Sequence, residues 1–164
     1  MDSLQELYVH KLQDLYSAEQ QITKALPAMI AKSTNEELRT GLEMHLGQTE
    51  QQREIVSRLI QKLNEKPGEE HCKGMEGIIT EGKKALAEVE EGDALDAIII
   101  AEQQSVEHYE IAGYGTAVTW ARVLGREDDA RELSQILEQE KATDEQLTRL
   151  AEAYINQAAK QGGR

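Results

Sequence analysis

Residues 107–110 read Glu-His-Tyr-Glu, and they interrupt a segment whose other residues are patterned as a buried helix. Glu110 falls on the apolar stripe of that segment, and Glu107, three residues earlier, lies on the same side of a helix. Gly113 and Gly115 have no side chains, so they would let a neighbouring helix approach closely. We therefore interpret the segment as a helix that presents two carboxylates to the interior.

Three other apolar stripes of the sequence are interrupted near their middle in the same way. The interrupting residues are Glu19 in the first stripe, His45, Thr49 and Gln52 in the second, and Glu140 and Asp144 in the last. Carboxylates and imidazoles are common metal ligands, whereas Thr49 and Gln52 are weak ligands that could serve only as hydrogen-bond partners.

The interruptions are predicted to lie at one level of a helical bundle. Glu19 precedes the turn at Thr34 by as many residues as Thr49 follows it. Glu110 and Glu140 are related in the same way to the turn at Gly125, with the same separation. Because a helix rises about 1.5 Å per residue, each lies roughly 22 Å from its turn. Antiparallel helices would place these residues opposite one another.

Carboxylates gathered inside a bundle must be neutralised, since an unpaired buried charge costs several kcal/mol and like charges repel. Protonation, pairing with Lys or Arg, or a bound cation would each achieve this. Arg53 is the basic residue nearest to the middle of a stripe, and it lies one position off. A divalent metal neutralises several carboxylates at once, and Glu, Asp and His suit iron or manganese. The predicted metal ligands are Glu19, His45, Gln52, Glu107, Glu110, Glu140 and Asp144. A hydrogen-bonded polar core without metal is the alternative.

The elements that must position these residues are long helices. Apolar spacing, caps and breakers predict helices at 3–32, 35–64, 94–124 and 127–158, with a shorter helix near 75–90. Pro27 is expected to bend the first of them. The predicted fold class is all-α: a four-helix bundle of two antiparallel helical hairpins, joined by a crossover at 69–92 that contains the short extra helix. Residues 1–160 would form a single domain, and 161–164 a disordered tail.

Composition and charge exclude several classes of function. Lys and Arg total 18 against 31 Asp and Glu, and this net charge of −13 argues against a nucleic-acid partner. The single cysteine, Cys72, excludes an intramolecular disulfide and fits a reducing compartment. His71 and Cys72 have no second pair at zinc-site spacing, so we interpret the thiol as a structural or an exposed one rather than a metal ligand. The sequence shows no secretory signal or membrane-spanning run, and the expected location is the cytoplasm.

Five segments carry a resemblance to a known family. They are LYSAEQQ (15–21), HLGQT (45–49), HCKGMEG (71–77), VEHYEIAGYG (106–115) and EKATDEQLTRLAE (140–152). These segments closely resemble the YciE/YciF-type family of bacterial stress-associated proteins, over residues 3–158. The resemblance implies a ferritin-like fold, a di-iron or iron–manganese centre between the helices, homodimers and a role under osmotic, heat or other stress.

Carried across by position, the resemblance implies a ligand glutamate on the first helix, a pair on the third and two ligands on the fourth. These are Glu19, then Glu107 and Glu110, then Glu140 and Asp144. The ferritin-like superfamily also has a Glu-x-x-His pair on each of the second and fourth helices. Here the second helix has His45 and Gln52, and the fourth has Glu140-Lys141-Ala142-Thr143 followed by Asp144, with no histidine. Because of this departure, one of the two metal positions is expected to have an unusual ligand set.

Two functions are therefore expected from the sequence. The first is a ferritin-like dinuclear-metal protein of stress defence, with two iron ions per chain, or manganese, or one of each. It would oxidise Fe(II) or reduce peroxide or dioxygen, with an unidentified electron donor. The alternative is a non-enzymatic helical stress protein, whose buried polar layer is structural and which acts through dimerisation or partner binding.

Overall fold

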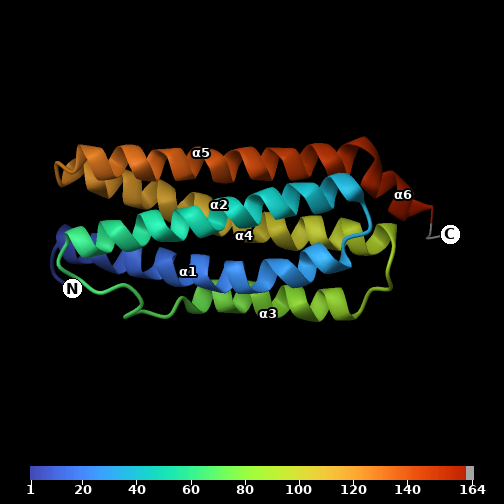
Figure 1. Ribbon diagram of the computed structural model, residues 1–164, viewed down its shortest axis with the longest axis horizontal. Helices are drawn as coiled ribbons and strands as arrows, with labels where there is room; N and C mark the ends of the chain where they lie inside the picture. Colours follow the sequence, from blue (N-terminus) through green and yellow to red (C-terminus); the bar gives the residue numbers. More distant parts are fainter. Residues whose placement is uncertain (162–164) are drawn as a thin grey trace.

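Four long helices lie side by side in the computed structural model, which describes residues 1–161 (Figure 1). Their bounds are α1 Leu4–Lys32, α2 Glu36–Lys62, α4 Asp93–Val123 and α5 Glu127–Leu150. The described residues contain no strand, which confirms the predicted all-α fold class. Within this range no helix combines the length and the apolar character needed to cross a membrane.

The bundle consists of two hairpins. α1 packs chiefly on α2 and α4 chiefly on α5, and the connection between the hairpins carries the short helix α3, Lys73–Ala87. Figure 1 shows α3 running along the outside of the bundle beside α1, and it also packs on α4. The predicted crossover with its extra helix is thus present.

Local hydrogen bonds fix where the first two helices begin and how they are joined. Ser3 and Glu6 form a capping box at the start of α1, and the Asn35 side chain caps α2. The buried Asp96 carboxylate, on α4, accepts hydrogen bonds from the backbone N–H groups of Thr34 and Asn35, at 2.8 and 2.9 Å. The turn between α1 and α2 is therefore tied to the second hairpin.

The structure differs from the predicted bounds by at most two residues in α1, α2 and α4, and by more in two places. α3 begins two residues before the predicted residue 75 and ends at Ala87. The helix predicted over 127–158 ends as α5 at Leu150, and a π-helical turn, Ala151–Ile155, leads into α6, Asn156–Lys160. Ala151 and Ile155 are both buried, so the apolar spacing continues through the turn and cannot reveal it. α1 runs through Pro27 to Lys32, and 162–164 of the predicted tail lie outside the described residues.

The hydrophobic core is divided into two clusters, one toward each end of the bundle. One cluster includes Ile22, Leu26, Leu42, Ile99 and Leu147. The other includes Leu12, Leu15, Leu59, Ala117 and Leu133. Along α2, α4 and α5 the predicted polar interruptions lie between residues of the two clusters, and on α1 Glu19 directly follows Ala18, the first residue of the cluster that includes Ile22. The apolar clusters above and below thus fix the level of the polar residues.

The two glycines of α4 have different surroundings. A Cβ atom on Gly113 would lie 2.8 Å from Cδ2 of Leu15 on α1, so α1 approaches α4 closely at this point. A Cβ on Gly115 would meet no atom of residues 1–161 within 4 Å. The predicted close approach is right for Gly113 and wrong for Gly115, because Gly115 lies at a half-buried position that faces no neighbouring helix closely.

Alanine substitutions at these two glycines are expected to have opposite effects on stability. Gly115→Ala should stabilise the protein by up to about 1 kcal/mol, because alanine favours a helix over glycine. Gly113→Ala receives the same benefit, but it must displace the buried Leu15, and overpacking costs about 1 to 3 kcal/mol. Urea unfolding of both variants measures the difference. Equal stabilisation by the two alanines would show that Gly113 is not a close-packed position.

Candidate metal centre

Five potential metal ligands meet in the layer between the two core clusters. Glu19 comes from α1, His45 from α2, Glu107 and Glu110 from α4, and Glu140 from α5. Each is at most 1% exposed. The predicted convergence on one level is therefore present in the structure, with every long helix contributing at least one residue.

Four of these residues form a compact set of donors. His45, Glu107, Glu110 and Glu140 each offer one ligand atom, and these atoms all lie within 4.8 Å of one another. Nε2 of His45 stands 3.0 Å from Oε1 of Glu107, but without the direction of a hydrogen bond. An imidazole nitrogen and several carboxylate oxygens thus face a common point.

Many polar atoms of the layer are buried without a hydrogen-bond partner among the described residues. Both carboxylate oxygens of Glu110 are in this state, as are Nε2 of His45 and one oxygen each of Glu19, Glu107 and Glu140. Buried polar groups are nearly always satisfied in native proteins. Buried ligand atoms that have no hydrogen-bond partner and that converge on one point are typical of a metal site. The residues of the layer therefore fit a metal ion.

The pKa values of these carboxylates reflect the same crowding. Burial, followed by the negative charge of Glu140, raises the pKa of Glu19 to about 8. Burial raises the pKa of Glu140 to about 8 and that of Glu107 to about 7. Burial and three neighbouring carboxylates raise the pKa of Glu110 well above its ordinary value. Without a cation, the layer therefore retains protons near neutral pH.

Two glutamines hold carboxylates of the layer in place. Nε2 of Gln52, on α2, donates hydrogen bonds to Glu140 and, at 3.0 Å, to Gln139. Nε2 of Gln103, one turn before Glu107 on α4, donates to Oε1 of Glu107 at 2.5 Å. Gln52 thus lies inside the layer as predicted, and its buried Oε1 has no partner in the described part of the chain.

Tyr114 completes the layer on the side of Glu19. Its hydroxyl is fully buried and donates a hydrogen bond to Oε1 of Glu19. Burial and the charge of Glu19 raise the pKa of Tyr114 well above its ordinary value, so the phenol keeps its proton. Tyr109 points elsewhere: its hydroxyl contacts Sγ of Cys72 at 3.0 Å and Asp14 at 3.1 Å.

Asp144 was a predicted ligand, but the structure does not bring it into the group. Its side chain is 22% exposed and lies within 3.1 Å of Nε2 of His108, which is itself exposed. Oδ1 of Asp144 also accepts a hydrogen bond from Gln104 at 3.0 Å. α5 therefore contributes Glu140 to the interior, whereas Asp144, four residues later, is held at the edge by two residues of α4.

Two residues of the site were not predicted. Gln103 contacts Glu107, and Oγ1 of Thr143 lies 3.4 Å from Nδ1 of His45. Gln103 stands four residues before Glu107 on the same helix face, so its spacing was a usable signal. Cys72 is buried, and its sulfur accepts from the backbone N–H of Met75 at the start of α3, which makes the thiol structural.

Comparisons with known proteins agree on one family. Residues 3–160 match the family described as Domain of unknown function (DUF892). Protein YciF of Escherichia coli (strain K12) is 39% identical over 160 residues, which are 97% of this chain and 96% of that protein. The crystal structure of that E. coli stress protein has a TM-score of 0.88 at 40% identity, covering 95% of this chain and 99% of the other.

A second solved structure is similar to the same extent. YcfI of Rhodopseudomonas palustris, whose description proposes a structural role, has a TM-score of 0.87 at 43% identity. The match covers 90% of this chain and 94% of that one. Both structures therefore share the helical architecture along nearly the whole chain.

Proposed function

The chain belongs to the DUF892 family, and we propose that it is a stress protein that holds a dinuclear iron or manganese centre inside its helical bundle. One observation carries the proposal. The carboxylate of Glu110 is fully buried, both of its oxygens lack a partner among the described residues, and three further buried carboxylates surround it. A cation is the partner that relieves all four at once.

The proposed centre has two neighbouring metal positions. His45 and Glu107 would serve one position, and Glu19 the other. Glu110 and Glu140 are charged neighbours of Glu19 and also belong to the compact donor set with His45 and Glu107. They would therefore be shared between the two metals.

The reaction we propose is oxidation of Fe(II), or reduction of peroxide or dioxygen. Bound iron or manganese would supply the change of oxidation state that this chemistry needs. The protein's own groups would orient the ligands: Gln52 fixes the carboxylate of Glu140, and Gln103 fixes that of Glu107. Tyr114 keeps its proton and holds the carboxylate of Glu19.

A second candidate function is favoured by the hydrogen bonds of the same layer. Gln52, Gln103 and Tyr114 each donate to a carboxylate, and such a network can fix the register of a bundle without metal. A non-enzymatic protein of this kind would act through its surface. The similar YcfI, with its proposed structural role, is compatible with this alternative.

Metal analysis of protein purified without chelators tests the proposal. The wild type is expected to contain close to two iron or manganese ions per chain. The double variant Glu110→Ala, Glu140→Ala removes both shared carboxylates and should lose nearly all of the metal. The matched control is Glu138→Ala, Glu145→Ala, which removes two exposed carboxylates of α5 and should keep the full content.

The outcomes separate the candidates. A wild type that stays empty after reconstitution with Fe(II) and with Mn(II) would reject the metal centre and favour the structural function. One ion per chain would reject the dinuclear form. Loss of that single ion in Glu107→Ala, with retention in Glu19→Ala, would assign it to the position of His45 and Glu107.

A further inference from the structure

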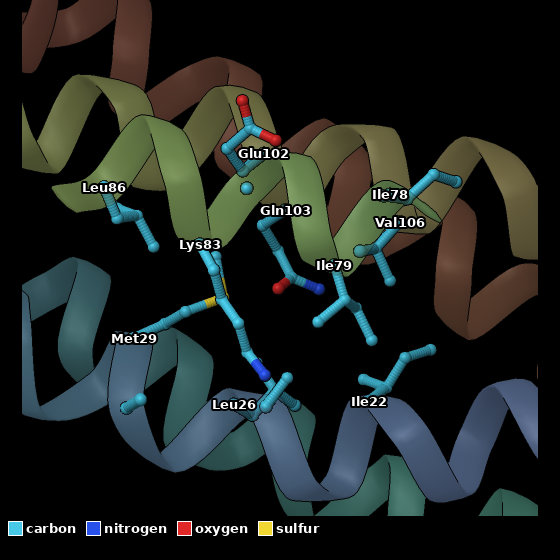
Figure 2. A pocket seen from close by; sticks show the side chains of 13 residues that line it. Ile22, Leu26, Met29, Ile78, Ile79, Lys83, Leu86, Glu102, Gln103 and Val106 are labelled. Atoms are coloured by element: carbon cyan, nitrogen blue, oxygen red, sulfur yellow. The ribbon is translucent and has the colours of Figure 1, made fainter. Parts of the chain in front are cut away.

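An apolar pocket lies between α1, α3 and α4 (Figure 2). It is next to the layer of Glu19, His45, Glu107, Glu110 and Glu140, which we call the metal-ligand layer. Its volume is about 50 Å³. Ile22 and Leu26 line it from α1, Ile79 and Leu86 from α3, and Val106 from α4. The pocket is therefore built mainly from aliphatic side chains, and the crossover helix α3 closes one side of it.

The inner end of the pocket adjoins the carboxylates. Gln103 lines the pocket and is only 1% exposed, and Figure 2 shows its amide pointing inward among the apolar side chains. The same amide donates a hydrogen bond to Oε1 of Glu107. A single side-chain amide thus separates the pocket from a ligand atom of the layer, and Val106 is the chain neighbour of Glu107.

The outer end of the pocket reaches the surface. Lys83 on α3 and Ala28 on α1 also line it, and both are exposed. The lining thus runs from exposed residues of two helices to the buried Gln103. The pocket has the position of an entrance to the metal-ligand layer.

Size and polarity restrict what this entrance admits. An apolar cavity does not hold water well, because water needs two or more polar partners, yet it binds apolar atoms and molecules such as xenon. Hydrogen peroxide, which donates and accepts hydrogen bonds, would lose most of those bonds on entering a lining that is aliphatic apart from Lys83, Glu102 and Gln103. Dioxygen has no hydrogen to donate and is small enough for about 50 Å³.

We propose that this pocket is an antechamber, that is, a binding site through which a small, uncharged, apolar molecule of the class of dioxygen reaches the metal-ligand layer. Gln103 is a positioning residue at its inner end. The inference rests on the proposed metal centre, since an antechamber requires a centre to serve. It goes further in selecting dioxygen over peroxide and in giving the crossover helix a function.

Xenon is the probe for the pocket itself. Crystals of the wild type, both metal-loaded and metal-free, under xenon pressure should show a xenon atom among Ile22, Ile79 and Val106. Ile79→Trp fills the pocket from α3, a helix that contributes no residue to the donor set, and should abolish xenon binding. The matched control Lys84→Trp places the same side chain on the exposed face of α3 and should retain xenon. Ala25→Leu, a milder filling substitution from α1, serves if Ile79→Trp does not fold.

Metal content of the same proteins distinguishes failure of the pocket from failure of the metal centre. All of the variants should keep the wild-type metal content. In the Fe(II)-loaded form, Ile79→Trp should slow oxidation by dioxygen much more than oxidation by hydrogen peroxide. A wild type with its metals but without xenon in the pocket would overturn the antechamber alone, as would equal slowing with both oxidants. A wild type without metal would overturn the proposed function, whatever xenon does.

Discussion

Chelation of the metal is expected to lower the Tm of the wild-type protein by about 10 °C. A ligand present at a thousand times its dissociation constant stabilises the folded state by about 4 kcal/mol. In a domain of this size, each kcal/mol corresponds to about 2 to 4 °C in Tm. The physical source is the layer itself: with metal removed, Glu19, Glu107, Glu110 and Glu140 must keep protons or repel one another inside a closed core. Thermal unfolding, followed by circular dichroism with and without chelator, measures the shift.

The variants of the shared carboxylates make this result specific. Glu110→Ala, Glu140→Ala should unfold at the same temperature with and without chelator, because it has little metal to lose. Glu138→Ala, Glu145→Ala should show the full wild-type shift. If the wild type itself shows no shift after loading with Fe(II) or Mn(II), the polar layer is structural and the metal proposal is wrong.

The level of the polar layer could be predicted because it depends on simple geometry. Helix rise is constant, so equal distances along the chain from the turns place Glu19, Glu110 and Glu140 at one height. The structure adds why the height is fixed: two apolar clusters enclose the layer from both ends. The family resemblance, which the comparisons confirm, led to the same residues independently.

The rotation of each residue about its helix axis was harder to predict. Glu140 and Asp144 are four residues apart and share a stripe in the sequence, but four residues do not complete a whole number of turns. Asp144 therefore drifts toward the edge of α5, where Gln104 and His108 from α4 bind its carboxylate. Which neighbour a polar side chain meets is decided by the packing of two helices, and one stripe does not contain that information.

The apolar pocket could not be predicted from the sequence either. Ile79 and Val106 are apolar residues on helical stripes, as any core residues are. Whether such residues fill a space or leave one depends on the fit of α3 against α1 and α4. The same holds for the π-helical turn after Leu150, which leaves the apolar spacing unchanged.

The metal-free protein is expected to lose stability as the pH rises from 5 to 8. Glu19, Glu107 and Glu140 have folded-state pKa values of about 8, 7 and 8, above the ordinary value of 4.5. Between pH 4.5 and these folded-state pKa values, the folded state binds protons that the unfolded state has released. Their stabilising contribution is complete below about pH 4.5 and disappears as the pH rises through 7 to 8. Because these carboxylates interact, they titrate as a group, and each proton that only the folded state retains contributes about 1.4 kcal/mol per pH unit.

Replacing one of these carboxylates by its amide isolates the effect. In the metal-free protein at pH 7, Glu140→Gln should raise the free energy of unfolding by about 3 kcal/mol. The reason is that the folded protein keeps this carboxyl group protonated at a pH some 2.5 units above its ordinary pKa of 4.5, and the amide needs no proton. The substitution should also flatten the dependence on pH. Glu145→Gln, at an exposed position of the same helix, should change neither. Urea unfolding at pH 5, 6, 7 and 8 gives the slopes.

Metal should reverse the sign of this dependence. A metal ion binds the deprotonated carboxylates, so protons compete with it and the loaded protein gains stability as the pH rises over the same interval. Glu140→Gln would then stabilise the metal-free protein and destabilise the loaded one. The Glu140 carboxylate destabilises the fold when no cation neutralises it, and it stabilises the fold when it binds the metal. Parallel pH dependence with and without metal would show that the ions bind elsewhere. If stability falls with pH in the metal-free protein and rises with pH in the loaded protein, and if this difference becomes smaller in Glu140→Gln, the metal ions bind among the buried carboxylates.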